Sequence, residues 1–281
     1  MAHSAVVLPD GRLHLQEGPI DIVLGLDGSR AARAEARDRA ATAFTGLLAA
    51  LVAELPLLRA PLGVDRPAPS YPVAQRMVAA TWPYRRGFIT PMAAVAGAVA
   101  EHVCAAVAEV PGLTSAYVNN GGDIALFLAP GQRLHVGLVR NLAHAAPEGL
   151  VRVRAEDPVR GIATSGWPGR SFSLGIADAV TVLAASAAAA DAAATVIANA
   201  VNVAHPAIRR APARSLEPDS DLGDLLVTTG VGPLPPEAVA AALAAGEAMA
   251  ETLLAQGLVH AALLAVGPEW RSVGNPLLSH G

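Results

Sequence analysis

The sequence predicts an α+β domain that combines an antiparallel sheet with long alanine-rich helices. Hydrophobic residues make up 53% of the 281 residues and charged residues only 16%, which is enough apolar material for one large core. Short segments typical of strands occur in pairs around Gly-rich turns, whereas the Ala-rich segments have helical periodicity. These segments do not alternate in a strict strand–helix–strand order, which argues against a Rossmann fold. We expect a single domain over residues 1–281.

Composition excludes several functional classes. The net charge of −4 and the pI near 6.0 provide no basic surface for nucleic acid. One cysteine, Cys104, cannot form an internal disulfide, which fits a reducing compartment. Residues 1–10 lack the basic start and the long apolar run of a secretory signal. The apolar windows 91–110, 180–203 and 237–266 contain acidic or amide residues, so we predict buried helices, no membrane span and a cytoplasmic protein.

The first 84 residues predict a hairpin, a helix and a crossover. Alternating apolar residues over 11–27 surround Gly18-Pro19 and predict two paired strands. Ser29 is a good N-cap for a helix over residues 30–58, which has one charged and one apolar face. Five prolines then predict an irregular Pro-rich crossover over residues 59–84.

The centre of the chain predicts a helix followed by strands. Thr90 as N-cap and Pro91 at the first helical position begin a helix over residues 92–110, which Pro111-Gly112 ends. Asn-Gly between apolar runs is a strong hairpin signal. The expected strands are residues 116–119, 124–128 and 134–139.

The second half repeats this mixture of elements. We expect a polar loop over residues 161–175, rich in Gly, Ser and Thr. Strands are predicted at residues 151–153, 179–184, 225–229 and 259–266, and helices at residues 186–204 and 236–256.

The most informative feature is a polar stripe on the helix predicted over residues 186–204. Between residues 190 and 203 the polar side chains are Asp191, Thr195, Asn199 and Asn202. At about 100° per residue they share one narrow face of an otherwise apolar helix. A buried carboxylate is costly unless it is paired, hydrogen-bonded or bound to a metal. Asp191 and Thr195, one turn apart, suit a hard cation such as Mg²⁺ with a phosphorylated ligand; alternatively, the stripe faces water or caps a neighbouring loop.

Two Gly-containing segments are further candidates for ligand binding. In the turn Asn120, Gly121, Gly122 and Asp123, the glycines permit positive φ and the carboxylate can accept a hydrogen bond from a ribose. In the second segment, the hydroxyls and free amides of Thr164, Ser165 and Gly166 offer a cradle for phosphate. Both patterns are also common in ordinary turns and polar loops, and neither is a Walker A loop or a nucleophile elbow.

The remaining polar residues give weaker signals. The eight His residues form no His-x-x-x-His pattern, so we do not expect zinc. Arg76, Arg85 and Arg86 lie in an aromatic stretch and either bind phosphate or solvate a loop. No side chain is assigned as the catalytic residue.

The order of three motifs resembles that of the ApbE superfamily, the FAD:protein FMN transferases. These motifs are Asn-Gly-Gly-Asp, then Ala-Thr-Ser-Gly, then Val-Thr-Val-Leu-Ala followed by Ala-Asp-Ala-x-Ala-Thr. The resemblance is greater to a separate cytosolic branch, through Pro-Met-Ala-Ala-Val-Ala-Gly at 91–97, Ser-Phe-Ser-x-Gly-x-Ala-Asp-Ala-Val at 171–180 and Ala-Asp-Ala-Ala-Ala-Thr at 190–195. It covers about residues 70–267 and implies an ApbE-like, T-fold-like domain.

The resemblance implies a specific binding site. Asp191 and Thr195 correspond to residues that hold Mg²⁺ beside the FAD pyrophosphate, together with the carbonyl of Leu126, and Asp123 corresponds to a residue that contacts FAD. In such enzymes Mg²⁺ neutralises pyrophosphate charge while a target hydroxyl attacks the FMN phosphorus and AMP leaves. The leading hypothesis is therefore a Mg²⁺-assisted flavin-nucleotide transferase or flavin-binding enzyme, with a nucleotide or other phosphorylated small molecule as ligand.

One departure from the transferases supports an alternative. They carry a His-x-x-Asp-Pro-x-x-Gly segment between the Thr-Ser-Gly motif and the Val-Thr-Val strand, whereas residues 167–179 here contain no His and no Asp-Pro. The alternative is an ApbE-fold protein with a non-flavin function, either binding another small ligand or serving as an accessory protein. Close-packing Ala-rich helices are compatible with a homo-oligomer under either hypothesis.

Overall fold

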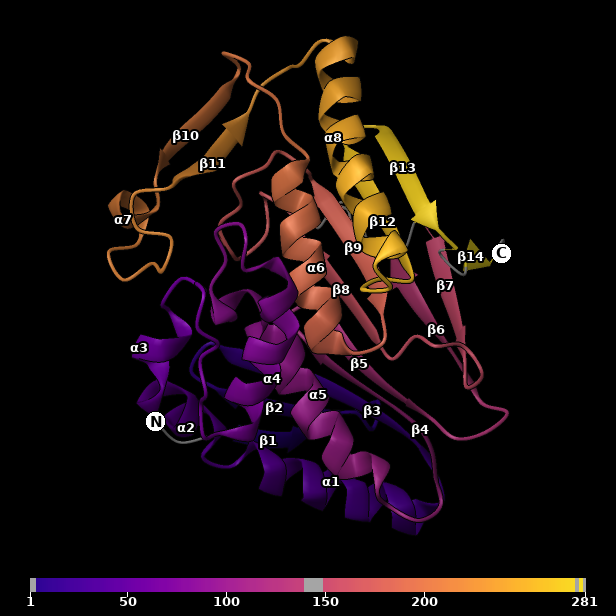
Figure 1. Cartoon of the computed structure of the whole chain (residues 1–281). Coiled ribbons are helices and arrows are strands. Elements are labelled where there is room, and N and C mark those ends of the chain that lie inside the picture. Colours follow the sequence, from indigo (N-terminus) through magenta and orange to yellow (C-terminus); the bar gives the residue numbers. More distant parts are fainter. Residues whose placement is uncertain (1–3, 139–148, 276–277, 280–281) are drawn as a thin grey trace. The chain divides into compact units, whose positions relative to one another are not determined.

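The structure is a computed structural model that describes residues 4–138, 149–275 and 278–279 (Figure 1). The chain forms two compact units. The first comprises Met1–Leu134, Val153–Ala163 and Ala185–Asp191, and the second comprises His135–Arg152, Thr164–Ala184 and Ala192–Gly281. Helices are mixed with antiparallel strands throughout, which confirms the predicted α+β class.

The first unit contains an antiparallel sheet whose neighbouring strands all run in opposite directions. Its order is β1 (Ser4–Val7), β2 (Leu13–Glu17), β3 (Ile20–Gly28), β4 (Leu113–Asn120), β5 (Asp123–Leu128) and β8 (Gly161–Ser165). The hairpin predicted over residues 11–27 is confirmed, with Gly18 at φ 56° in its turn. Strand β1 was not predicted, because this edge strand is mostly exposed and its sequence has no apolar alternation.

The helices of the first unit correct the length of one predicted helix. Ser29 caps α1 (Arg30–Phe44) as predicted, since its hydroxyl accepts from the Ala32 N–H at 3.1 Å. The single helix expected over residues 30–58 is wrong: Gly46 adopts φ 76°, which ends the first helix. The chain continues as α2 (Leu47–Ala53) and α3 (Leu55–Leu58).

The Pro-rich crossover is also more ordered than expected. Residues 59–84 contain α4 (Pro72–Thr81) and the 3₁₀ turn η1 (Trp82–Tyr84), so the irregular stretch predicted there is shorter. Pro72 is in the first turn of α4, where a missing N–H costs nothing. The prolines dominated the sequence signal, but the buried side chains of Val73, Met77 and Val78 determine the helix.

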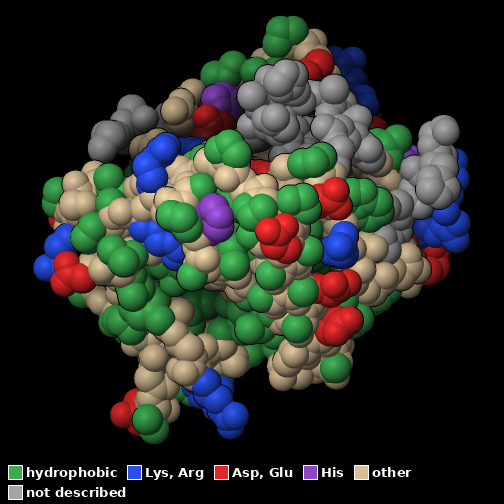
Figure 2. All heavy atoms as spheres, turned by 90° about the horizontal axis from the view of Figure 1, so that it is seen from above, with side chains coloured by type: hydrophobic (Ala, Val, Ile, Leu, Met, Phe, Trp, Pro, Cys, Tyr) green, Lys and Arg blue, Asp and Glu red, His purple; other side chains and the backbone are tan. Residues whose placement is uncertain are grey.

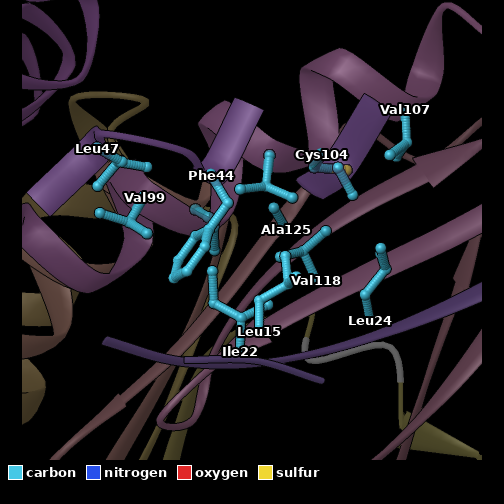
Figure 3. Packing of buried hydrophobic residues seen from close by; sticks show 14 of the residues in the cluster. Leu15, Ile22, Leu24, Phe44, Leu47, Val99, Cys104, Val107, Val118 and Ala125 are labelled. Carbon is cyan, nitrogen blue, oxygen red and sulfur yellow. The ribbon is translucent and has the colours of Figure 1, made fainter. Parts of the chain in front are cut away.

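The core of the first unit lies between its helices and one face of its sheet. The 3₁₀ turn η2 (Pro91–Ala94) leads into α5 (Val95–Ala108), and α5 packs on α1, β4 and β5. The Thr90 hydroxyl, expected as an N-cap, makes no capping hydrogen bond there. Figure 3 shows Phe44 of α1 and Val99 and Cys104 of α5 near the apolar side chains of the strands.

The buried Cys104 thiol gives a direct check of this packing. Burial, reinforced by Glu101, raises the pKa of Cys104 to about 12. Because only the thiolate reacts with disulfide reagents, we expect no labelling by a thiol-specific chromogenic reagent at pH 8 and one reacting thiol per chain after unfolding in urea. Rapid labelling of the native protein would contradict the packing of α5.

Glu54, at the junction of α2 and α3, holds the start of α4. Its Oε1 accepts hydrogen bonds from the N–H and the hydroxyl of Ser70, at 2.6 and 2.7 Å. These bonds, with one from the Tyr71 N–H, lower the pKa of Glu54. A lowered folded-state pKa stabilises the fold above the unfolded pKa, near 4.5, and this contribution is lost as the pH falls through the folded value.

We therefore expect Glu54→Gln to lower the free energy of unfolding at pH 7 by about 0.5–1 kcal/mol, a small value because the site is solvent-exposed. The difference from wild type should shrink when the pH is lowered below the unfolded value, for example to pH 3. Urea unfolding at both pH values measures it, with the exposed Glu251→Gln as control. A loss of the same size at both pH values would show that the charge of Glu54 is irrelevant.

The second unit contains further antiparallel strand pairs. Strand β12 (Ala261–Val266) pairs antiparallel with β9 (Ala179–Ala184) and with β13 (Glu269–Gly274). Strand β10 (Ile208–Pro212) pairs with β11 (Leu226–Val231) in a two-stranded sheet. A three-stranded sheet has the order β14 (Leu278–Ser279), β7 (Gly149–Arg154) and β6 (Arg133–Leu138). The helices are the end of α6 (Ala187–Ala200), α7 (Ala213–Leu216) and α8 (Pro236–Ala255). Helix α6 ends four residues before the predicted limit of 204.

Two helical segments are long and apolar enough to cross a membrane by length and composition alone. They are Pro91–Ala108, of mean hydropathy 1.5, and Pro236–Ala255, of mean hydropathy 1.4. Both also pack on strands of their own unit, α5 on β4 and β5 and α8 on β12 and β13, as core helices do. On the face in Figure 2, acidic and basic side chains are interspersed among hydrophobic ones.

Candidate functional site

The turn between β4 and β5 is tied to the first turn of α5. Gly121 and Gly122 adopt φ 68° and 114°, which the tight turn requires. The side chain of Asn120 is buried and donates from Nδ2 to the Ala96 carbonyl at 3.1 Å. This turn therefore has a structural role in addition to the predicted binding role, and it carries Asp123 beside the N-terminus of α5.

Asp191 lies at the same helix end. Its Oδ2 accepts from the Gly97 N–H at 2.9 Å, and the Ala96 amide also stabilises the carboxylate. Burial, followed by the charge of Asp123, nevertheless raises the pKa of Asp191 well above its usual value. The structure thus brings Asp123 close enough to Asp191 for their charges to interact, while the predicted binding roles of both residues stay predictions. Two neighbouring carboxylates, one of them desolvated, are a favourable environment for a cation.

The other predicted metal ligands have less defined surroundings. Thr195 follows Asp191 by one turn on α6, so both side chains lie on the same face of that helix. Leu126 is buried in β5, and its N–H donates to the Arg160 carbonyl at 2.9 Å. Among the described residues there is no cluster of three or more His, Cys, Asp or Glu side chains. A cation here would need hydroxyl and carbonyl oxygens, which is the type of ligand set predicted for Asp191, Thr195 and Leu126.

The far end of the polar stripe holds a loop. Asn199 Oδ1 accepts from the Leu174 N–H at 2.8 Å and from the Ser173 hydroxyl at 3.2 Å. Asn202, just beyond α6, donates to the Leu174 carbonyl at 3.0 Å. Asn199 and Asn202 therefore cap a neighbouring loop, which is one of the alternatives predicted for the polar stripe. Asp191 has different hydrogen-bond partners.

The predicted phosphate cradle is not a loop at its start. Residues 161–165 form β8, because Ile162 and Ala163 are buried and Ile162 pairs with Ile124 of β5. Thr164 is exposed near the end of this strand and its hydroxyl shares a 2.8 Å hydrogen bond with Thr181. A Cβ at Gly166 would overlap the Asp178 carbonyl, so this glycine permits close packing of the chain on itself. Binding by Thr164, Ser165 and Gly166 stays a prediction.

The arginines of the aromatic stretch have separate roles. Arg76 forms an ion pair with Glu101, with Nε 3.3 Å from Oε1. Arg85 stacks on the Trp82 ring, 4.5 Å from its centroid, and Arg86 is exposed.

A cavity of about 320 Å³ is lined by Arg66, Pro67, Ala68, Pro69, Gln75 and Val78, none of which belongs to the predicted site.

Two polar side chains with structural hydrogen bonds were not predicted from the sequence. Glu101 is the only acidic residue in α5 and contacts the N-terminus of α6, which its isolated position in an apolar helix could have indicated. Asp178 accepts from Trp167 Nε1 at 3.1 Å and from the Gly267 N–H at 2.6 Å. It holds two turns of the second unit together, and no local pattern in the sequence reveals this role.

Comparison with family models assigns the chain to the ApbE superfamily. The family model described as AbpE bacteria matches residues 5–272, and the chain belongs to that family. A UPF0280 protein of Methanospirillum hungatei is 35% identical over 133 residues, which cover 47% of this chain and 52% of that protein. A UPF0280 protein of Methanopyrus kandleri is 40% identical over 155 residues, covering 55% of this chain and 59% of that protein.

The matched part of this chain spans about half the length of the first of these curated relatives. Among solved structures, the chain is similar to the Pseudomonas stutzeri flavinyl transferase ApbE in its apo form. That comparison has 13% identity and a TM-score of 0.44, and it covers 97% of this chain and 94% of that one.

Proposed function

We propose that this protein binds a flavin nucleotide, FAD, with the help of Mg²⁺ and acts as a flavin-nucleotide transferase or flavin-binding enzyme. Membership of the ApbE superfamily supports the class of ligand. The observation that carries the proposal is the Asp191 carboxylate, which lies beside Asp123 with a raised pKa. A carboxylate so disfavoured in its charged form gains most from a bound cation.

The residues present fit Mg²⁺, which prefers hard oxygen ligands. Asp191 and Thr195 would hold the ion, with the Leu126 carbonyl as a third ligand, and Asp123 would contact the nucleotide. When bound, Mg²⁺ supplies charge neutralisation at a pyrophosphate. The chain's own contribution is orientation: the Gly97 N–H fixes Asp191 Oδ2, and Asn120 fixes the turn that carries Asp123.

Titration of EDTA-treated protein with FAD, with and without Mg²⁺, tests the proposal. We expect binding in the micromolar range that depends on Mg²⁺, followed by slow release of AMP if a protein hydroxyl is the acceptor. Flavin fluorescence and calorimetry measure the binding. If FAD fails to bind under both conditions, the flavin proposal is wrong.

A second candidate function is the binding of a different small ligand by an ApbE-type fold. It is favoured by residues 167–179, which lack the His and Asp-Pro of the transferases and whose side chains instead make internal contacts. Asp178 bonds to Trp167, and Ser173 bonds to Asn199. A colourless protein that binds other phosphorylated or carboxylated compounds would favour this candidate. Cytoplasmic location and homo-oligomer formation stay predictions under either function.

A further inference from the structure

The first turns of α5 and α6 meet at an unusually close contact. A Cβ added at Gly97 of α5 would overlap the carbonyl of Ala187, the first residue of α6. Each helix N-terminus has unpaired N–H groups and a partial positive charge. Two such ends brought together need acceptors, and preferably negative ones.

Each helix supplies the acceptor for the other. Asp191 of α6 accepts from the Gly97 N–H in the first turn of α5, at 2.9 Å. Glu101 of α5 accepts through Oε2 from the Ala188 N–H in the first turn of α6, at 3.3 Å. The two hydrogen bonds cross the same contact in opposite directions. Sliding or rotating either helix would therefore break both of them.

Glu101 is itself held from a third helix. Its other oxygen, Oε1, lies 3.3 Å from Arg76 Nε of α4, and Arg76 Nη1 lies 3.4 Å from His102 Nδ1. The Arg76 and Glu101 side chains are about 30% exposed. Since burial and Arg76 lower the pKa of His102, this imidazole is neutral near pH 7 and does not compete with Arg76 for Glu101. The carboxylate of Glu101 thus has a defined orientation toward α6.

We propose that Glu101, held by Arg76, is a positioning residue for Asp191: it fixes the first turn of α6 on α5 and thereby aims the Asp191 carboxylate at the Mg²⁺ site. This inference rests on the proposed function, because it assumes that Asp191 binds the cation. Glu101 contacts Ala188, three residues before Asp191, so it acts through the helix backbone. Residues that orient metal ligands in this way commonly change metal affinity by about 10–100-fold when they are removed.

The first arm of the test needs no metal. Hydrogen exchange of the Ala96 and Gly97 amides is measured in EDTA-treated full-length protein. Glu101→Ala is expected to accelerate exchange at both amides by about tenfold, although Glu101 bonds to neither, since loss of its hydrogen bond releases α6 and with it Asp191. Glu101→Gln keeps an oxygen for the Ala188 N–H, although not the charge that pairs with Arg76, and should restore most of the protection. The control is Glu109→Ala, a 79% exposed side chain just after α5.

The second arm measures Mg²⁺ binding by calorimetry on the same proteins, at a temperature where circular dichroism shows each to be folded. We expect Glu101→Ala to raise the Kd for Mg²⁺ about tenfold and Glu109→Ala to stay within about threefold of wild type. Glu101→Gln keeps the oxygen for Ala188 but loses the ion pair with Arg76, so its loss should be smaller than that of Glu101→Ala. Arg76→Met leaves Glu101 in place but removes its anchor. Arg76→Met should give an intermediate loss of Mg²⁺ affinity. It keeps the proposal testable if Glu101→Ala does not fold.

The outcomes separate this inference from the proposed function. If wild type binds Mg²⁺ and both Glu101→Ala and Arg76→Met bind it equally well, the positioning role is wrong while the metal site stands. If only Ala188 loses protection and Gly97 does not, Glu101 is an ordinary helix cap and the proposal is also overturned. If wild type itself binds no Mg²⁺, the proposed function fails, and this inference fails with it.

Discussion

Replacing Asp191 with asparagine is expected to abolish the effect of Mg²⁺ on FAD binding, raising the Kd measured with Mg²⁺ by about 100-fold or more, since loss of a ligand exceeds the usual cost of losing a residue that only orients one. Asparagine has the same shape and keeps an oxygen for the Gly97 N–H, so the tie to α5 is preserved. What it removes is the negative charge beside Asp123. The variant therefore separates the charge of Asp191 from its structural hydrogen bond.

The stability of the metal-free variant provides a second readout with a defined sign. Burial and Asp123 raise the pKa of Asp191 in the folded protein above its unfolded pKa, near 3.8. The charged carboxylate therefore destabilises the metal-free fold increasingly as the pH rises above 3.8, and this effect is complete once the pH exceeds the folded-state pKa. At pH 7 the neutral asparagine should leave the metal-free protein at least as stable as wild type. Added Mg²⁺ should then raise the melting temperature of wild type only.

Thermal unfolding and flavin fluorescence, each with EDTA and with Mg²⁺, measure both effects, and the exposed Asp65→Asn is the matched control. An Asp191→Asn protein that binds FAD as tightly as wild type in both conditions would show that Asp191 is only a helix cap. An Asp191→Asn protein that is much less stable than wild type in EDTA would also show that Asp191 is only a helix cap.

The pairing of Asp123 with Asp191 could be predicted from sequence, whereas the reason for their proximity could not. The polar stripe made Asp191 a candidate ligand beside the alternatives of facing water or capping a loop, and the resemblance in motif order linked it to Asp123. The contact that positions them is between Gly97 and Ala187, 90 residues apart, and small residues in Ala-rich helices give no signal of their partner. Helix and strand positions depend on local periodicity, but a close helix crossing depends on tertiary structure.

Errors in the predicted elements have comparable physical causes. Gly46 breaks a helix that is otherwise continuous in its periodicity, because its positive φ is set by the turn toward α2. Residues 161–165 are a polar-ended strand because β5 offers a partner for Ile162, which sequence alone does not show. Asn199 and Asn202 bind the loop near Leu174, whereas their polarity alone could not decide between a ligand, water and a loop.

Gly97 offers the strongest test of the helix crossing. Within a helix, Gly→Ala usually stabilises by about 1 kcal/mol, because alanine loses less backbone entropy on folding. Here the new Cβ would overlap the Ala187 carbonyl and approach the Ala188 nitrogen. These are backbone atoms, so no rotamer change can relieve the overlap, and overpacking of this kind costs about 3 kcal/mol. The expected net effect of Gly97→Ala is a loss of about 2 kcal/mol.

Such a loss corresponds to a fall in melting temperature of about 4–8 °C for a chain of this size. Gly63→Ala is the control, since a Cβ there meets nothing within 4 Å and its φ is ordinary. Because separating α5 from α6 also moves the Gly97 N–H away from Asp191, Gly97→Ala should weaken Mg²⁺-dependent FAD binding even where it remains folded. A Gly97→Ala protein that is more stable than wild type would mean that helix propensity outweighs the contact, and that α5 and α6 are not locked together at this point.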